Sequence, residues 1–265
     1  MMQNSDTEKI DLEWNDDDVV PPIVYPDLEF LFQQMLRLTL EEVAPGHGEL
    51  ILDIGCGKAV DGAQLSEKGA RVIGLEPSKV MMVRAKEYLS ESNAEVALAQ
   101  GIGENLPFKP HSFHKVMCKG ALDHFFSPSK TMEEIAHVLK PEGEMIIAIA
   151  NFESLGFHVG KRLYPITKFL SPSLYGQRKP WEPPPDHQYK FDYPFLSSLV
   201  KQHFEIKKTK GISLLFGLPL WGSLLSRLPH SVSHAILKIL DKLARPFPSL
   251  ADVILMKCTP IHNPK

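Results

Sequence analysis

The chain has 265 residues, of which 43% are hydrophobic and 23% charged, as expected for one globular domain with a sizeable core. Its formal net charge of −3 gives no sign of nucleic-acid binding. The cysteines lie far apart and lack metal-ligand spacing, which predicts reduced thiols in a cytoplasmic protein and no metal site. They are Cys56, Cys118 and Cys258.

The N-terminal residues differ in character from the rest of the chain. Residues 1–26 are acidic and polar, the reverse of a signal peptide, and end in "PPIVYP". This composition predicts a flexible arm that could close over a site through Tyr25. From residue 27 apolar residues recur at helical spacing, which predicts a helix over 27–43 capped by Asp27.

Short apolar runs then alternate with helical patterns up to residue 150. Strands are predicted at 49–54, 70–76, 94–100, 113–118 and 143–150, and helices at 58–69, 78–92 and 128–139. Such alternation predicts an α/β fold, a Rossmann-like sheet that is mostly parallel and has helices on both faces. Right-handed crossovers would bring the carboxyl ends of the strands, and any ligand, to one edge.

The rhythm breaks after Ala150, where residues 151–190 are rich in proline and aromatic residues and predict an irregular insertion. Further on, the pattern predicts helices at 193–203 and 230–244, strands at 204–213 and 251–258, and an apolar piece at 214–229. The sheet would then have seven strands. We expect residues 27–265 to form one domain in which residues 151–250 make a cap.

The stretch "LDIGCG" combines a strand end, a carboxylate and a glycine turn. Gly55 and Gly57 would let the backbone approach a nucleoside-bearing ligand, and the following helix N-terminus would offer free amides. Asp53 would repel the pyrophosphate of a dinucleotide but attract a cation. S-adenosylmethionine (SAM) carries a sulfonium and an ammonium and therefore fits this turn.

These residues resemble the first motif of class I SAM-dependent methyltransferases, in particular the ubiquinone-methyltransferase-like, methyltransferase type 11 group. "VIGLEPS", "GIGENLPF", "FHKVMCKGALDHF" and "VLKPEGEMIIAI" resemble the later landmarks of the group in the same order. The resemblance is close over about residues 45–150. It implies SAM as cofactor, S-adenosylhomocysteine as product, and these cofactor-binding residues: Asp53, Gly55, Cys56, Gly57, Glu76, Pro77, Met81, Ile102, Gly103, Glu104 and Lys119.

Within that set, Glu76 lies about 20 residues after the glycines, the spacing at which an acid reaches a ribose diol. Ile102 stands where the group usually has an aspartate that reads adenine, so the backbone of Gly103 or the side chain of Glu104 would serve instead. Lys119 would point away from the sulfonium or meet the carboxylate of the ligand.

Two histidines are candidate catalytic bases. His124 ends "GALDH" near the expected methyl group, although a histidine here also fits a helix-cap or packing residue. His187 lies in the irregular insertion, as do the further candidates His158 and Tyr189. Transfer without a base is the alternative, because alignment of the two reactants can itself accelerate the reaction.

The sequence therefore predicts methyl transfer from SAM to an oxygen, nitrogen or carbon of a small hydrophobic acceptor. The alternatives are a SAM-binding protein without activity and an NAD(P)-dependent oxidoreductase. We expect the cap to enclose the acceptor through Phe157, Tyr164, Trp181, Tyr189, Phe191, Phe216 and Trp221. Ten Lys or Arg residues against four acids between 161 and 210, next to the apolar piece, leave weak contact with a membrane surface open.

Overall fold

The computed structural model describes residues 11–17, 24–170, 179 and 181–261. Within these ranges seven strands form one sheet in the order β3-β2-β1-β4-β5-β7-β6. Neighbouring strands run parallel from β3 to β5, and β7 is antiparallel to both β5 and β6. The strands are β1 Leu50–Ile54, β2 Arg71–Glu76, β3 Val96–Gln100, β4 Phe113–Lys119, β5 Leu139–Ala150, β6 Phe204–Ile212 and β7 Val253–Pro260.

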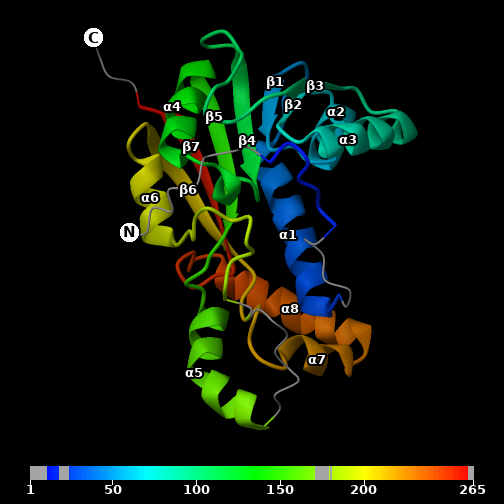
Figure 1. Cartoon of the computed structure of the whole chain (residues 1–265), viewed down its shortest axis with the longest axis vertical. Coiled ribbons are helices and arrows are strands. Elements are labelled where there is room, and N and C mark those ends of the chain that lie inside the picture. The colour runs from blue at the N-terminus through cyan, green and yellow to red at the C-terminus, as the bar shows by residue number, and fades with distance from the viewer. Residues whose placement is uncertain (1–10, 18–23, 171–178, 180, 262–265) are drawn as a thin grey trace.

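Helices cover both faces of this sheet, as Figure 1 shows. The prediction of a seven-stranded, mostly parallel sheet with helices on both faces is confirmed. The helices are α1 Pro26–Val43, α2 Val60–Glu67, α3 Lys79–Ser92, α4 Pro128–Val138, α5 Leu155–Leu170, α6 Tyr193–Val200, α7 Trp221–Ser226 and α8 His230–Ala244, with a 3-10 turn at Leu122–His124.

The strand residues alternate between two hydrophobic clusters, because successive side chains of a strand point to opposite faces. In β1, Leu52 and Ile54 join the cluster under α4 and α6, whereas Ile51 joins the cluster under α1 and α2. Both faces of the central strands are buried, as is usual for parallel sheets covered by helices. The order in which successive strands are added to the sheet reverses between the parallel neighbours β1 and β4, and the carboxyl ends of these two strands flank the position where such sheets bind ligands.

Two predicted details of the helices are wrong. The first helix starts at Pro26, so Tyr25 is its N-cap residue and the buried Asp27 lies inside its first turn. Part of the predicted irregular insertion is the helix α5, which continues through Pro165. Gly156 and Gly160 let α5 approach the 215–217 loop closely, so tertiary packing holds a helix that local propensity does not favour.

The predicted cap divides into two parts. Helix α6 and strand β6 belong to the sheet and its cover, whereas α5, α7 and α8 gather at the end of the molecule towards which the parallel strands run (Figure 1). No helix in the described residues combines the length and the apolar character needed to cross a membrane. All three cysteines are free thiols.

Asp252, just before β7, is a buried carboxyl that should make stability depend on pH. Its Oδ2 accepts a hydrogen bond from the Phe216 N–H (3.1 Å), and its Oδ1 has no hydrogen-bond partner among the described residues. Burial raises the pKa of Asp252 to about 7. A carboxyl with a raised folded-state pKa stabilises the fold at low pH, and this stabilisation is lost as pH rises towards 7.

We therefore expect Asp252→Asn to increase the free energy of unfolding at pH 8 by about 2–4 kcal/mol, with the gain fading as the pH falls from about 7 to about 4. Urea unfolding of both proteins across this range measures the difference. The exposed carboxyl variant Glu87→Gln is the matched control and should show no such trend. Equal stabilities of Asp252→Asn and wild type at pH 8 would contradict the expectation.

Candidate functional site

The glycine turn after β1 packs directly against the turn after β4. Gly55 and Gly57 have φ values of 70° and 54°, in the left-handed region that favours glycine. A Cβ on Gly55 would lie 2.4 Å from the Cβ of Ala121, so a larger residue would separate the two turns. The N–H groups of Gly55 and Cys56 both donate to the Leu75 carbonyl, which ties the turn to β2.

Glu76 ends β2 and holds the same turn from the other side. Its Oε2 accepts from the Gly57 N–H and its Oε1 accepts from the Ser78 N–H, each at 3.0 Å. Burial raises the pKa of Glu76. Each carboxylate oxygen has two lone pairs, so Glu76 can accept further hydrogen bonds from hydroxyl groups of a ligand.

The site concentrates negative charge around Asp53. This residue is buried, and its Oδ2 accepts no hydrogen bond from the described residues. Burial, and then repulsion from the Asp61 carboxylate, raises the pKa of Asp53 well above its ordinary value, while Lys119 opposes the rise. Lys119 lies 3.2 Å from Asp61, so its charge is already paired. A cationic ligand would favour ionised Asp53.

The cysteine of the turn is not a reactive thiol. Burial, followed by the charge of Asp53, raises the pKa of Cys56, which keeps the thiol neutral. Met81 is buried, and its methyl group lies 3.6 Å from where a Cβ on Gly57 would be, so it supports the turn from below. Pro77, between Glu76 and the Ser78 N-cap of α3, is half-buried.

The residues expected to read adenine are arranged around a second tight turn. Ile102 is half-buried and bridges to Asn105, and a Cβ on Gly103 would crowd Phe125. The Oε1 of Glu104 accepts from the N–H groups of residues 126 and 127, at 2.8 and 3.2 Å. The side chain of Glu104 therefore anchors the turn before α4. Of the two partners expected for adenine, the backbone of Gly103 is the one that this contact does not occupy.

Asp123, His124 and His187 meet at the carboxyl end of β4. The Nδ1 of His187 lies 3.0 Å from the Oδ2 of the buried Asp123, and the Nε2 of His124 lies 3.9 Å from its Oδ1. The Asp123 carbonyl accepts from the N–H groups of residues 188 and 189, which fixes the His187 loop to this turn. A carboxylate at Nδ1 favours the tautomer in which Nε2 is the basic nitrogen.

The N-terminal segment 11–17 lies over these groups. The Trp14 indole N–H donates to Asp186 (2.8 Å), whose Oδ2 also lies 3.4 Å from the Nδ1 of His124. The indole packs edge-on against the His124 ring at a centroid distance of 5.5 Å. The backbone carbonyl of Trp14 accepts a hydrogen bond from the Ser78 hydroxyl, so Trp14 spans the ends of β2 and β4. Tyr25, by contrast, lies beside Gly222 of α7.

The structure therefore brings His124 and His187 together with three residues that sequence reasoning missed: Trp14, Asp123 and Asp186. Only Asp123 had a usable signal, because it stands beside His124 in the quoted "GALDH". Among the described residues, Asp123, His124 and His187 are the group whose ligand atoms lie close enough to hold a metal ion. His158 lies elsewhere, on α5 beside Glu153.

The cap aromatics do not form one wall. Phe157 packs against Phe216 and against Phe152, whose ring meets the His187 ring edge-on at 5.9 Å. The other predicted wall residues pack elsewhere, in separate clusters: Tyr164 with Trp181, Tyr189 with Phe191, and Trp221 with the small core of α1, α7 and α8. Of these rings, Phe152 therefore adjoins His187, with Phe157 packed against Phe152 and Phe216 against Phe157.

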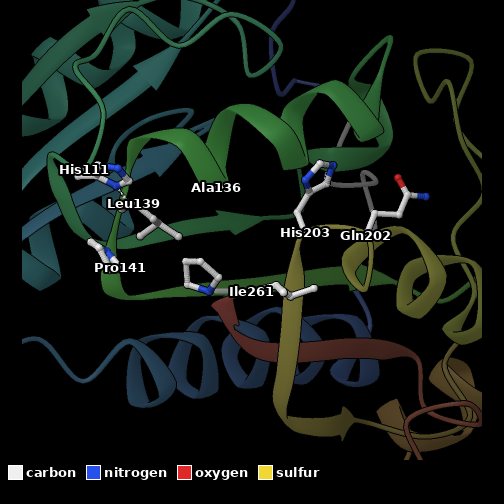
Figure 2. Close-up of a pocket in the computed structure, with 8 residues that line it drawn as sticks. His111, Ala136, Leu139, Pro141, Gln202, His203 and Ile261 are labelled. Atoms are coloured by element: carbon white, nitrogen blue, oxygen red, sulfur yellow. Dashed lines mark hydrogen bonds between the residues drawn. The ribbon is translucent and has the colours of Figure 1, made fainter. Parts of the chain in front are cut away.

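A hollow of about 370 Å³ lies at the opposite edge of the sheet. Figure 2 shows His111 and Leu139 at one side of it and Gln202 and His203 at the other. These residues surround the amino ends of β4, β5 and β6, whereas ligands of such sheets bind at the carboxyl ends. The hollow is therefore separate from the candidate site.

The sheet has the strand order of class I SAM-dependent methyltransferases, with β7 antiparallel to its neighbours. Strand β1 has an acidic end and is followed by a glycine turn, at the point where the order of the strands reverses. Together these features define the Rossmann-like fold of that class. Residues 51–143 match the family described as methyltransferase domain. This match identifies residues 51–143 as part of a class I SAM-dependent methyltransferase domain, as the sequence motifs predicted, and SAM is the cofactor of that class.

Curated relatives match part of the chain. It is 34% identical over 98 residues to the uncharacterized methyltransferase YcgJ of Bacillus subtilis, covering 37% of this chain and 39% of YcgJ. It is 27% identical over 142 residues to a ubiquinone biosynthesis O-methyltransferase of Stutzerimonas stutzeri, covering 49% of this chain and 61% of the relative. The chain thus spans less than two thirds of the length of these relatives.

The fold extends over more of the chain. The structure of a Haloferax volcanii methyltransferase, solved in complex with the Trm112 methyltransferase activator, superposes with a TM-score of 0.60 at 16% identity. The match covers 90% of this chain and 93% of that protein. At this identity the similarity establishes the fold alone.

Proposed function

We propose that the protein transfers the methyl group of SAM to a hydroxyl oxygen of a small hydrophobic molecule. This proposal rests on one observation: two sets of residues lie close together where the order of the strands reverses, at the carboxyl ends of β1 and β4. One is the Gly55–Gly57 turn with its carboxylates, and the other is the His187–Asp123 pair. Residues 27–265 would act as one domain, with α5, α7 and α8 on the acceptor side.

The residues present fit SAM. Asp53 offers a buried carboxylate oxygen that has no hydrogen-bond partner among the described residues, and Asp53, Asp61 and Glu76 outnumber Lys119, the cation that pairs with Asp61. This excess favours a ligand with a sulfonium and an ammonium group. Glu76 would accept hydrogen bonds from the ribose diol, and Gly55, Cys56 and Gly57 would follow the ligand with their backbone. Pro77, Met81, Ile102 and Gly103 would surround the adenine.

SAM, when bound, supplies a methyl group activated by a sulfonium. A neutral hydroxyl oxygen is a weak nucleophile, so a base that removes its proton accelerates attack. His187 would accept this proton at Nε2, and Asp123 would hold the imidazole orientation and stabilise the imidazolium. His124 and Asp186, joined to Trp14, would position the acceptor and exclude water from the site.

Two further features support the acceptor class. Phe152 adjoins His187 and is backed by Phe157 and Phe216, and these apolar rings suit a hydrophobic acceptor. The name of the Stutzerimonas stutzeri relative specifies methylation of oxygen in ubiquinone biosynthesis, and an aromatic hydroxyl is the corresponding expectation for this chain.

The experiment that tests the proposal combines binding and turnover. Titration calorimetry with SAM, S-adenosylhomocysteine and NAD should give binding for the first two only. Incubation with methyl-labelled SAM and a panel of hydrophobic phenols should move label into the phenols but not into their methyl ethers, which lack the proton to be removed. Binding of NAD in place of SAM, or transfer only to amines, would contradict the proposal.

A further inference from the structure

Helix α8 exposes several large apolar side chains to solvent although part of its buried face is polar. Its buried residues are Ser233, Leu237, Asp241 and Ala244, of which two are polar. The apolar residues Val232, Ile239 and Leu243 face outwards, and Ile239 and Leu243 are 59% and 55% exposed. A helix of an ordinary surface buries its apolar stripe and exposes its polar one.

Helix α5 repeats this arrangement. Leu163, Ile166 and Phe169 recur every three residues on its outer side, and Phe169 is 85% exposed. Its inner side is fixed by the close approach of Gly156 and Gly160 to the 215–217 loop. The outward apolar stripe is therefore a property of the docked helix.

The two stripes belong to one end of the molecule. The segment after α8 adds the exposed Phe247 and Leu250, and the Leu250 carbonyl accepts from the Leu155 N–H at the start of α5 (2.9 Å). Leu224 of α7 is exposed as well. Figure 1 shows α5, α7 and α8 together at the lower end of the molecule. We call the exposed apolar residues 163, 166, 169, 224, 232, 239, 243, 247 and 250 the apolar end.

The charged residues within α5, α7, α8 and the segment after α8 are almost all positive, whereas Glu153, just before α5, is exposed and pairs with Lys161. Residues 155–170 and 221–250 contain seven Lys or Arg residues and one acid, Asp241. Asp241 is buried and pairs with Arg245, so it does not offset the outer cations. Lys238 and Lys242 are exposed on α8 next to Ile239 and Leu243, and Arg162 is exposed on α5 next to Leu163.

We propose that the apolar end docks on the surface of a membrane that contains anionic lipids. The cations complement the lipid phosphates, while the apolar side chains enter the boundary between headgroups and acyl chains. At 16 and 15 residues, α5 and α8 are shorter than the roughly 20 residues that a membrane-crossing helix needs, and each has one face committed to the fold. Both helices therefore lie along the surface.

A test uses the full-length protein and sedimentation with vesicles of phosphatidylcholine, alone or mixed with phosphatidylglycerol. We expect binding to the mixed vesicles that weakens with added salt. Ile166→Glu with Phe169→Glu, and separately Ile239→Glu with Leu243→Glu, should each lower the partition coefficient about tenfold or more. Lys238→Ala with Lys242→Ala should lower it by about fivefold per lysine and reduce the salt dependence.

The matched control is Val83→Glu, since Val83 on α3 is 55% exposed, as is Leu243, but lies outside the apolar end. It should bind vesicles like wild type, and circular dichroism should show that all variants fold. The proposal would be overturned if the protein bound neutral and mixed vesicles equally or bound neither. It would also be overturned if Val83→Glu lost as much vesicle binding as the variants of the apolar end. So would a dimer in analytical ultracentrifugation that the same substitutions dissociate, because a second copy would then cover the apolar end.

Discussion

Replacing His187 with asparagine is expected to lower kcat by about 100- to 10,000-fold, the usual contribution of a positioned base, while SAM affinity stays unchanged. The reason is that asparagine can still face the Asp123 carboxylate but cannot accept the proton of the acceptor hydroxyl. The measurement is single-turnover methyl transfer together with calorimetric titration of SAM. The rates of wild type and variant should be compared over a range of pH, because loss of a general base removes the corresponding limb of the pH–rate profile.

The matched control for this prediction is His158→Asn, because His158 lies exposed on α5 beside Glu153, away from the His187–Asp123 pair. It should retain wild-type turnover. Asp123→Asn should lower kcat in the same direction as His187→Asn, since an amide would no longer fix the imidazole tautomer. If His187→Asn kept the wild-type rate and pH profile, transfer without a base would be the better mechanism.

Replacing Glu76 with alanine is expected to weaken SAM binding by about 1.5–3 kcal/mol, the usual value for hydrogen bonds to a charged group. The variant would remove the acceptor proposed for the ribose diol and the carboxylate that holds the Gly57 N–H. Glu76→Gln should lose less, because it keeps one oxygen that can accept a hydrogen bond. Calorimetric titration of SAM measures each loss.

Two measurements make this second prediction decisive. Thermal unfolding of the ligand-free proteins shows whether the glycine turn survives, and Glu95→Gln, an exposed carboxyl change before β3, provides the control. The Kd of SAM should rise for Glu76→Ala and remain constant for Glu95→Gln. An unchanged Kd in a folded Glu76→Ala protein would remove Glu76 from the site.

The sequence predicted the sheet well because its strands are buried on both faces and read as continuous apolar runs. It failed at α5, where two glycines and Pro165 hide a helix that tertiary contacts, among them those with the 215–217 loop, stabilise. Pattern arguments describe local preference, and here the tertiary contact overrides it.

The same distinction applies to the candidate site. Asp53 and Glu76 were predictable as neighbours, because adjacent parallel strands place their carboxyl ends together. Asp123 and His187 come together only because the 186–189 loop hydrogen-bonds to the Asp123 carbonyl. Trp14 reaches the site from a segment whose composition indicated only a flexible arm. No periodicity in the sequence encodes either contact.

The insertion of β7 between β5 and β6 has a consequence for synthesis on the ribosome. Strand β6 bonds to β7 on its one paired side, and β7 consists of residues 253–260, some forty residues later in the chain. Until β7 emerges, the apolar edge of β5 and the whole of β6 lack their partner, and unpaired edges invite intermolecular pairing. Strand β7 thus completes the sheet after β6 has been translated, and chains that stop before residue 253 should be aggregation-prone.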